Sequence, residues 1–172
     1  MTLRLTSITL LILTALEPRL ALAQAAQPQP AAAALNIAGD IASPVQLSLA
    51  DLAKMPRATA TVHEMDGSSN RYEGVALRDV LTRAGAPLGK DFRGKAVSTC
   101  VLAKARDGYA AVFTLGEVDP DFGNEQIIVA DKRNGEPLPE NQGPFRIVCP
   151  NDKHGARSVR MLETLEVMRL RK

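Results

Sequence analysis

Short runs of alternating apolar and polar residues divide much of this chain into predicted strands. Residues 59–63 and 72–75 carry strand-forming side chains, and the turn residues of 66–70 separate them, so this region predicts a β-hairpin. Further strands are expected at residues 96–103, 110–113, 126–130, 145–149 and 162–167.

Two segments instead repeat their apolar residues at helical spacing. Leu77 is followed by apolar residues three, four and seven positions later, and a glycine then supplies a helix stop. A shorter helix that begins after the N-cap Ser48 is expected to bury Leu49, Leu52 and Ala53. Helices and strands do not alternate regularly, and most strands fall in the second half. The pattern therefore predicts an α+β fold.

The N-terminal residues 1–23 have the pattern of a secretory signal. An early arginine is followed by an apolar run at 5–16, and the small residues Ala21 and Ala23 predict cleavage before residue 24. The run has about 12 residues, fewer than the roughly 20 that span a bilayer, so an uncleaved anchor is the weaker alternative. Residues 24–34 then predict a disordered Gln, Pro and Ala spacer. Residues 35–172 predict a single domain.

The export route follows from the charges of the signal. Only one arginine precedes the apolar run, so the twin-arginine signature of folded export is absent. We therefore expect a periplasmic or secreted protein that leaves by the general secretory route. No membrane span is expected after cleavage.

Charge and aromatic content argue against nucleic acid as a partner. The 21 Lys and Arg residues are nearly balanced by 19 Asp and Glu and are interspersed with them, whereas nucleic-acid binders carry a one-sided basic surface. Four Phe, two Tyr and no Trp leave few side chains for stacking on bases. A basic cluster at 169–172 has the ordinary explanation of a solvated chain end.

Two cysteines, Cys100 and Cys149, allow two interpretations. In an oxidising compartment an even number of cysteines favours a disulfide. Closing a loop of this length would stabilise the fold by about 4 kcal/mol. Alternatively, both are separate buried thiols that behave as small apolar residues. Both lie in strand-like runs, and the choice depends on whether the fold brings their Cβ atoms within ~4 Å of each other.

A recognisable set of motifs occupies five segments of the chain: residues 74–81, 107–109, 134–138, 143–148 and 155–160. In order and spacing they resemble the molybdopterin-binding domain of the sulfite oxidase family, in its small stand-alone exported form. The resemblance covers roughly residues 45–167. It implies an α+β fold of mostly antiparallel and mixed strands with a few short helices, and it implies molybdopterin as the cofactor.

The same resemblance implies a molybdenum ligand that this chain lacks. In the family, a cysteine thiolate on the strand before the Gly-Val-x-Leu helix holds the metal, and residues 59–64 occupy that strand here. No cysteine lies there, and neither Cys100 nor Cys149 takes the matching position. Hydroxyl and imidazole groups do not replace a soft thiolate. We therefore expect no metal site, no catalytic residue and no bound cofactor.

Segment 155–160 matches the family's pterin-phosphate loop and supplies the candidate ligands Arg157, Ser158 and Arg160. Paired guanidiniums and a hydroxyl can hold an anion, and an ordinary solvated loop is the alternative. Asp-Gly-Tyr at 107–109 predicts a hairpin turn, and the resemblance implies that Tyr109 lies at the mouth of the site. His63 lies on the strand without the cysteine, so a pocket residue competes with an ordinary surface histidine.

These observations favour a cofactor-free binding or accessory module over an enzyme. Its expected partner is a small anion or a periplasmic protein. One alternative is a molybdopterin-dependent oxidoreductase acting on a small oxo-anion or sulfoxide. The other is a structural exported domain without a ligand. The missing thiolate and the missing twin-arginine signature both favour the first hypothesis.

Overall fold

The described structure starts close to the predicted start of the domain. The computed structural model describes residues 33–63 and 67–170. The predicted signal and nearly all of the predicted spacer lie outside these residues, and the first strand begins at Ala34, the last residue assigned to the spacer. In the described part of the chain, no helix is long and apolar enough to cross a bilayer.

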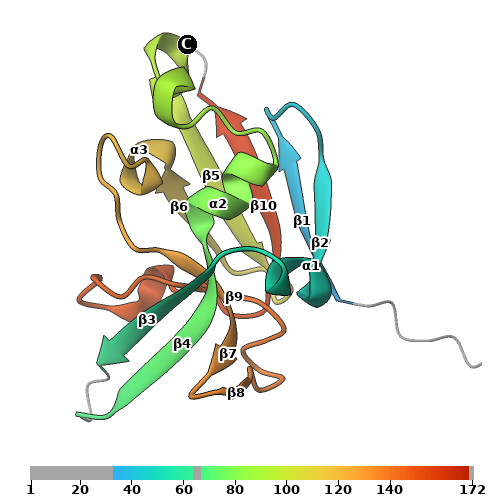
Figure 1. Cartoon of the computed structure of the whole chain (residues 1–172), viewed down its shortest axis with the longest axis vertical. Coiled ribbons are helices and arrows are strands. Elements are labelled where there is room, and N and C mark those ends of the chain that lie inside the picture. The colour runs from blue at the N-terminus through green and yellow to red at the C-terminus, as the bar shows by residue number, and fades with distance from the viewer. Residues whose placement is uncertain (1–32, 64–66, 171–172) are drawn as a thin grey trace, which may run out of the picture. The chain divides into compact units, whose positions relative to one another are not determined.

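One sheet joins strands from the beginning, middle and end of the domain, in the order β2-β1-β10-β5-β6 (Figure 1). β1 runs parallel to β10, and the other neighbours are antiparallel. The strands are β1 (Ala34–Gly39), β2 (Val45–Ser48), β5 (Thr99–Ala105), β6 (Ala110–Thr114) and β10 (Leu162–Arg169).

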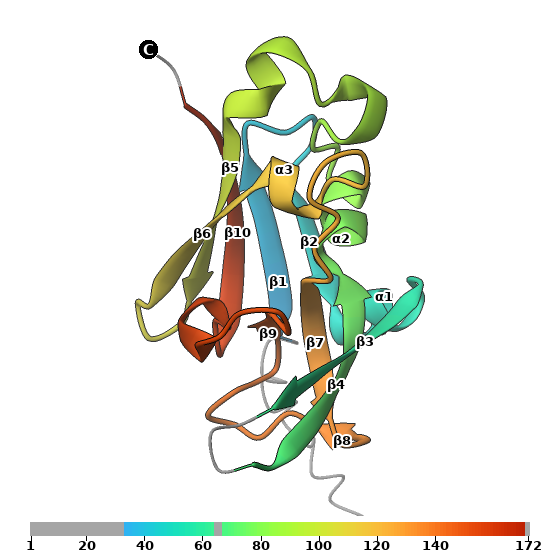
Figure 2. The same ribbon diagram turned by 90° about the vertical axis from the view of Figure 1, so that its left-hand side faces the viewer.

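A second sheet carries the predicted hairpin. Its order is β3-β4-β7-β8, and β9 also pairs with β7, with antiparallel neighbours throughout. The hairpin β3–β4 extends from the rest of this sheet in Figure 2, and its prediction is confirmed. The strands are β3 (Arg57–His63), β4 (Ser69–Ala76), β7 (Ile128–Arg133), β8 (Glu136–Pro137) and β9 (Arg146–Val148).

Short helices complete the structure, and the predicted N-cap of the first is confirmed. They are α1 (Leu49–Ala53), α2 (Leu77–Arg83) and α3 (Leu115–Val118), with 3-10 turns η1 (Gly89–Asp91), η2 (Gly94–Ser98) and η3 (Gly155–Arg157). Ser48 and Asp51 form a reciprocal capping box. The predicted apolar face of α1 was wrong in part, because only Leu52 is buried while Leu49 is 43% exposed.

The main core lies where α2 packs against the first sheet (Figure 1) and where the second sheet meets it. Leu77, Val80 and Leu81 of α2 are fully buried in it, which confirms the helical spacing. Burying each such side chain stabilises the fold by about 1.5–3 kcal/mol. A smaller cluster under the hairpin includes Tyr72 and Val148.

Mostly antiparallel strands with a few short helices confirm the predicted fold class. Some boundaries differ, because β5 begins at Thr99 only after the 3-10 turn η2. β1 and β2 were not predicted. β1 depends on pairing with β10 from the far end of the chain, which no local pattern reveals.

Candidate functional site

Segment 155–160 lies in the connection between β9 and β10. Its first three residues form η3. Val159 is fully buried, and its carbonyl accepts a hydrogen bond of 2.8 Å from the amide of Ile147 on β9. The amide of Leu162 in turn donates to the carbonyl of Phe145 over 2.8 Å. A buried anchor therefore holds the turn at the end of the second sheet, while its polar residues remain near the surface.

A pocket of about 240 Å³ lies beside this turn and brings together three predicted site residues. Its lining residues are Asp107, Tyr109, Gly155, Ala156, Ser158 and Arg160. The hairpin between β5 and β6 forms one wall, and η3 forms the other. The phenol of Tyr109 donates a hydrogen bond of 2.5 Å to the carbonyl of Ala156. This bond joins the two walls, and the ring of Tyr109 remains 48% exposed.

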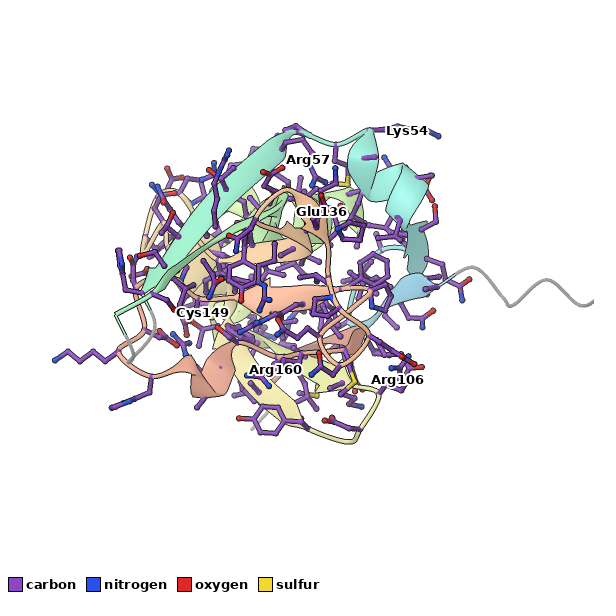
Figure 3. The ribbon with its side chains drawn as sticks, turned by 90° about the horizontal axis from the view of Figure 1, so that it is seen from below. Lys54, Arg57, Arg106, Glu136, Cys149 and Arg160 are labelled. Atoms are coloured by element: carbon purple, nitrogen blue, oxygen red, sulfur yellow. The ribbon has the colours of Figure 1, made fainter. Side chains whose placement is uncertain are left out.

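Ser158 and Arg160 present complementary groups to the pocket. Ser158 is buried, and its Oγ accepts a hydrogen bond of 3.2 Å from the amide of Cys149. Arg160 is exposed, and its guanidinium makes no ion pair or hydrogen bond with any described residue. Figure 3 shows Arg160 on the opposite side of the view from Arg57, the first residue of β3. A hydroxyl held by a hydrogen bond and a cation without a partner among the described residues therefore line one cavity.

Arg157 has different surroundings, although it matched the same motif. Its Nε and Nη2 donate to the carboxylate of Asp152 over 2.9 and 2.8 Å, and its Nη1 donates to Glu117 over 2.7 Å. Its guanidinium also lies 5.3 Å from the ring centre of Phe113. The hydrogen bonds that Arg157 donates to Asp152 and Glu117 raise the pKa of Arg157 above its usual range. It does not line the pocket.

The predicted turn at 107–109 is confirmed, and it also contributes to the pocket. Gly108 has a positive φ of 88°, and the backbone amide of Tyr109 donates to Asp107 over 3.0 Å. The turn closes the β5–β6 hairpin. Asp107 therefore places a carboxylate on the pocket wall, whereas its sequence context indicated only a turn residue.

His63 lies at the exposed end of β3 and is not part of this pocket. Its Nδ1 is 2.8 Å from the hydroxyl of Ser69 on β4, the residue paired with it across the hairpin. The structure therefore separates His63 from Ser158 and Arg160. The contact between His63 and Ser69 joins the two strands at the end of the hairpin.

Neither cysteine provides a metal ligand or a disulfide. Cys100 lies on β5 in the first sheet, and Cys149 directly follows β9 in the second. Both are free thiols and are 6% and 5% exposed. Of the two interpretations, the disulfide was therefore wrong and the buried thiols are found. Burial raises the pKa of Cys149 to about 12, so the thiol is protonated at neutral pH.

The strand that would carry the family's metal ligand, β3, has no cysteine. β3 borders a second hollow of about 250 Å³, which it lines with Ala58 and Thr59. Neither side chain is a soft donor for molybdenum. Among the described residues, no group of three or more His, Cys, Asp or Glu side chains could hold a metal ion. The residues present therefore do not fit the thiolate-bound molybdenum of the family.

The chain matches the model of the oxidoreductase molybdopterin-binding domain over residues 23–172. It belongs to this family. Its fold is similar to that in the crystal structure of the sulfane dehydrogenase SoxCD from Paracoccus pantotrophus, with a TM-score of 0.63 and 21% sequence identity. That alignment covers 80% of this chain and 38% of the SoxCD chain. No curated protein matches the chain.

Family membership agrees with the predicted sulfite-oxidase-like fold, and the structure adds residues that motif spacing could not supply. Asp152 is five positions from Arg157, but Glu117 is far away in sequence. For the pair of Arg157 and Asp152, the only local signal in the sequence is the short separation of the carboxylate and the arginine. The contact with Glu117 depends on the tertiary fold.

Proposed function

We propose that this family member is a cofactor-free module that binds a small anion beside η3. The observation that carries the proposal is the contrast between two parts of the molecule. The strand expected to hold the metal has no thiolate, whereas the turn expected to hold the phosphate places Arg160, which pairs with no described residue, at a pocket. A fold can persist after its original chemistry is lost.

Pocket size supports a small ligand. A cavity of about 240 Å³ is below the roughly 300–1,000 Å³ of most organic-ligand sites, and is large enough for phosphate or sulfate. Arg160 supplies a planar set of donors that suits oxygen anions, and the hydroxyl of Ser158 can donate a further hydrogen bond. A phosphate group on a larger molecule would place the remainder of that molecule outside the pocket.

The proposed setting is the periplasm or the exterior, reached by the general secretory route. The support is the apolar run at 5–16 and the small residues before residue 24. An anion-binding module in this setting could serve a periplasmic protein by delivering or sensing its ligand. The proposed partner is therefore a small anion or a periplasmic protein.

The alternative function is a molybdopterin-dependent oxidoreductase, which family membership favours. The cofactor would supply two-electron redox chemistry, and segment 155–160 is the part of this chain that would contact its phosphate. The absence of a cysteine on β3 and the burial of both thiols argue against a metal centre of the family's kind.

Isothermal titration with phosphate and sulfate tests the binding site. Arg160→Gln should weaken binding about ten- to a hundredfold, because it removes a charged hydrogen bond of roughly 1.5–3 kcal/mol. Arg93→Gln is the matched control, since Arg93 is also exposed and lies outside the pocket. Equal affinities of the wild type and Arg160→Gln would contradict the site.

Elemental analysis distinguishes the two functions. Protein purified from its native compartment should contain no stoichiometric molybdenum if the proposal is right. One molybdenum per chain would instead contradict the cofactor-free proposal and favour the oxidoreductase alternative, whatever the anion titration shows.

A further inference from the structure

The guanidinium of Arg157 joins three separate parts of the fold. It contacts Asp152 in the loop after β9, Glu117 of α3 and the ring of Phe113 on β6. The pair with Asp152 is bidentate, which fixes the plane of the guanidinium as well as its position. Arg157 is the last residue of η3, so these contacts hold the end of the turn.

Glu117 uses its two carboxylate oxygens for different tasks. Its Oε1 accepts hydrogen bonds from the amide and hydroxyl of Thr114, at 3.3 and 3.2 Å, in the capping box of α3. Its Oε2 accepts from Arg157. The N-terminus of α3 and the turn η3 are therefore joined through one side chain, and movement of either would disturb the other.

The same contacts make Arg157 a poor anion ligand. One positive charge faces two carboxylates, so the local charge of this trio is negative. An incoming anion would meet repulsion from Asp152 and Glu117 and would have to displace a hydrogen bond already made. Arg160 carries no such partner among the described residues and lines the pocket itself.

We propose that Arg157 is a positioning residue, and that Arg160 alone supplies the positive charge to the bound anion. The ion pairs of Arg157 hold η3 in the conformation that directs Ser158 and Arg160 into the pocket. This inference rests on the proposed function for the ligand, but the hold on η3 is a property of the protein without ligand. The two arginines of one motif thus have separate tasks.

Two readouts separate these tasks. The first is the dependence of phosphate affinity on salt concentration, because each cation that contacts the anion adds to the salt sensitivity. The second is hydrogen exchange at the amides of Ser158 and Val159, which bond to carbonyls within the turn. The variants are Arg157→Gln, Arg157→Lys and Arg160→Gln.

For Arg157→Gln we expect faster exchange in the turn and weaker phosphate binding, with the salt sensitivity of the wild type retained. For Arg157→Lys we also expect faster exchange and weaker phosphate binding, although the charge is conserved, because lysine cannot form the bidentate pair. For Arg160→Gln we expect unchanged hydrogen exchange at the amides of the turn and a phosphate affinity that hardly depends on salt concentration.

Two results would overturn the inference. One is a flattened salt dependence in Arg157→Gln that equals that of Arg160→Gln, which would make Arg157 a ligand. The other is unchanged exchange and affinity in Arg157→Gln. If the wild type binds no phosphate or sulfate, the proposed function fails, and the exchange experiment still decides whether Arg157 holds the turn.

Discussion

Burial controls the chemistry of Cys149. The side chain is 5% exposed within the main core, and desolvation raises its pKa from 9.0 to about 12. Between these values the folded protein keeps a proton that the unfolded chain releases. The thiol therefore contributes stability that is complete below pH 9 and is lost as the pH rises towards 12.

Replacing this thiol should remove that part of the pH dependence. Between pH 9 and 12 the free energy of unfolding of the wild type should fall more steeply than that of Cys149→Ala, by up to about 1.4 kcal/mol per pH unit. Urea unfolding of both proteins under reducing conditions measures the difference. Parallel curves for the two proteins would show that the thiol does not titrate as described.

Side-chain type could be predicted from the sequence at the candidate site, but the contacts that each side chain makes could not. Arg157 and Arg160 fit the same motif, and both were predicted as anion ligands. Tertiary contacts separate them, because Glu117 reaches Arg157 only after α3 has packed beside η3. The placement of Tyr109 at the pocket agrees with the resemblance, while Asp107 was recognised only as a turn residue.

At the level of elements, β4 and β7 approach each other unusually closely at Gly74. A Cβ added there would lie 2.0 Å from the carbonyl oxygen of Val129 and 2.6 Å from the Cα of Ala130. The pairing register of the two strands also shifts between Glu73 and Gly74. Backbone atoms cannot move aside cheaply, so this position of the sheet accepts no side chain.

Gly74→Ala should therefore destabilise the protein by about 1–3 kcal/mol or more, as for other overpacked interiors. Gly155→Ala is the matched control, since a Cβ at Gly155 meets no described atom within 4 Å. Its free energy of unfolding should change by less than about 0.5 kcal/mol. Thermal or urea unfolding measures both variants, and similar stabilities for the two would contradict the close approach.

Elements with local signals were predicted well, and elements that depend on distant partners were not. The hairpin β3–β4 has turn residues between its strands, and α2 has an apolar face and a glycine stop. β1 has only six residues and gains its partners from β2 and β10. Leu35 and Ile37 alternate along β1 and are both buried. Ile37 pairs with Leu165 of β10, so this burial depends on a strand from the far end of the chain.

At the scale of the whole molecule, the motifs that predict the fold are distinct from the residue that would bind the metal. The family's sheets and core are present, although the strand expected to carry the thiolate has none. The main core of the domain is built mostly from aliphatic side chains, with Phe92, Phe113 and Phe145 among them. Motifs could therefore predict the fold, because packing residues persist independently of the ligand.

The chain as a whole is also expected to lose its first residues on export. Ala21 and Ala23 satisfy the small-residue rule at the two positions that signal peptidase reads, so the mature protein should begin at or near Gln24. Intact-mass spectrometry of the exported protein measures this end. A membrane-bound form that retains Met1 or Thr2 would show an uncleaved anchor instead.

The scarcity of aromatic residues makes Tyr109 an optical probe of the pocket. The chain has no tryptophan and only two tyrosines, and Tyr72 is buried under the hairpin at 1% exposure. The phenol of Tyr109 spans the pocket walls, so its environment changes whenever the cavity is filled or opened. Ultraviolet emission from the unlabelled protein can therefore follow ligand entry in real time, with Tyr109→Phe identifying the signal.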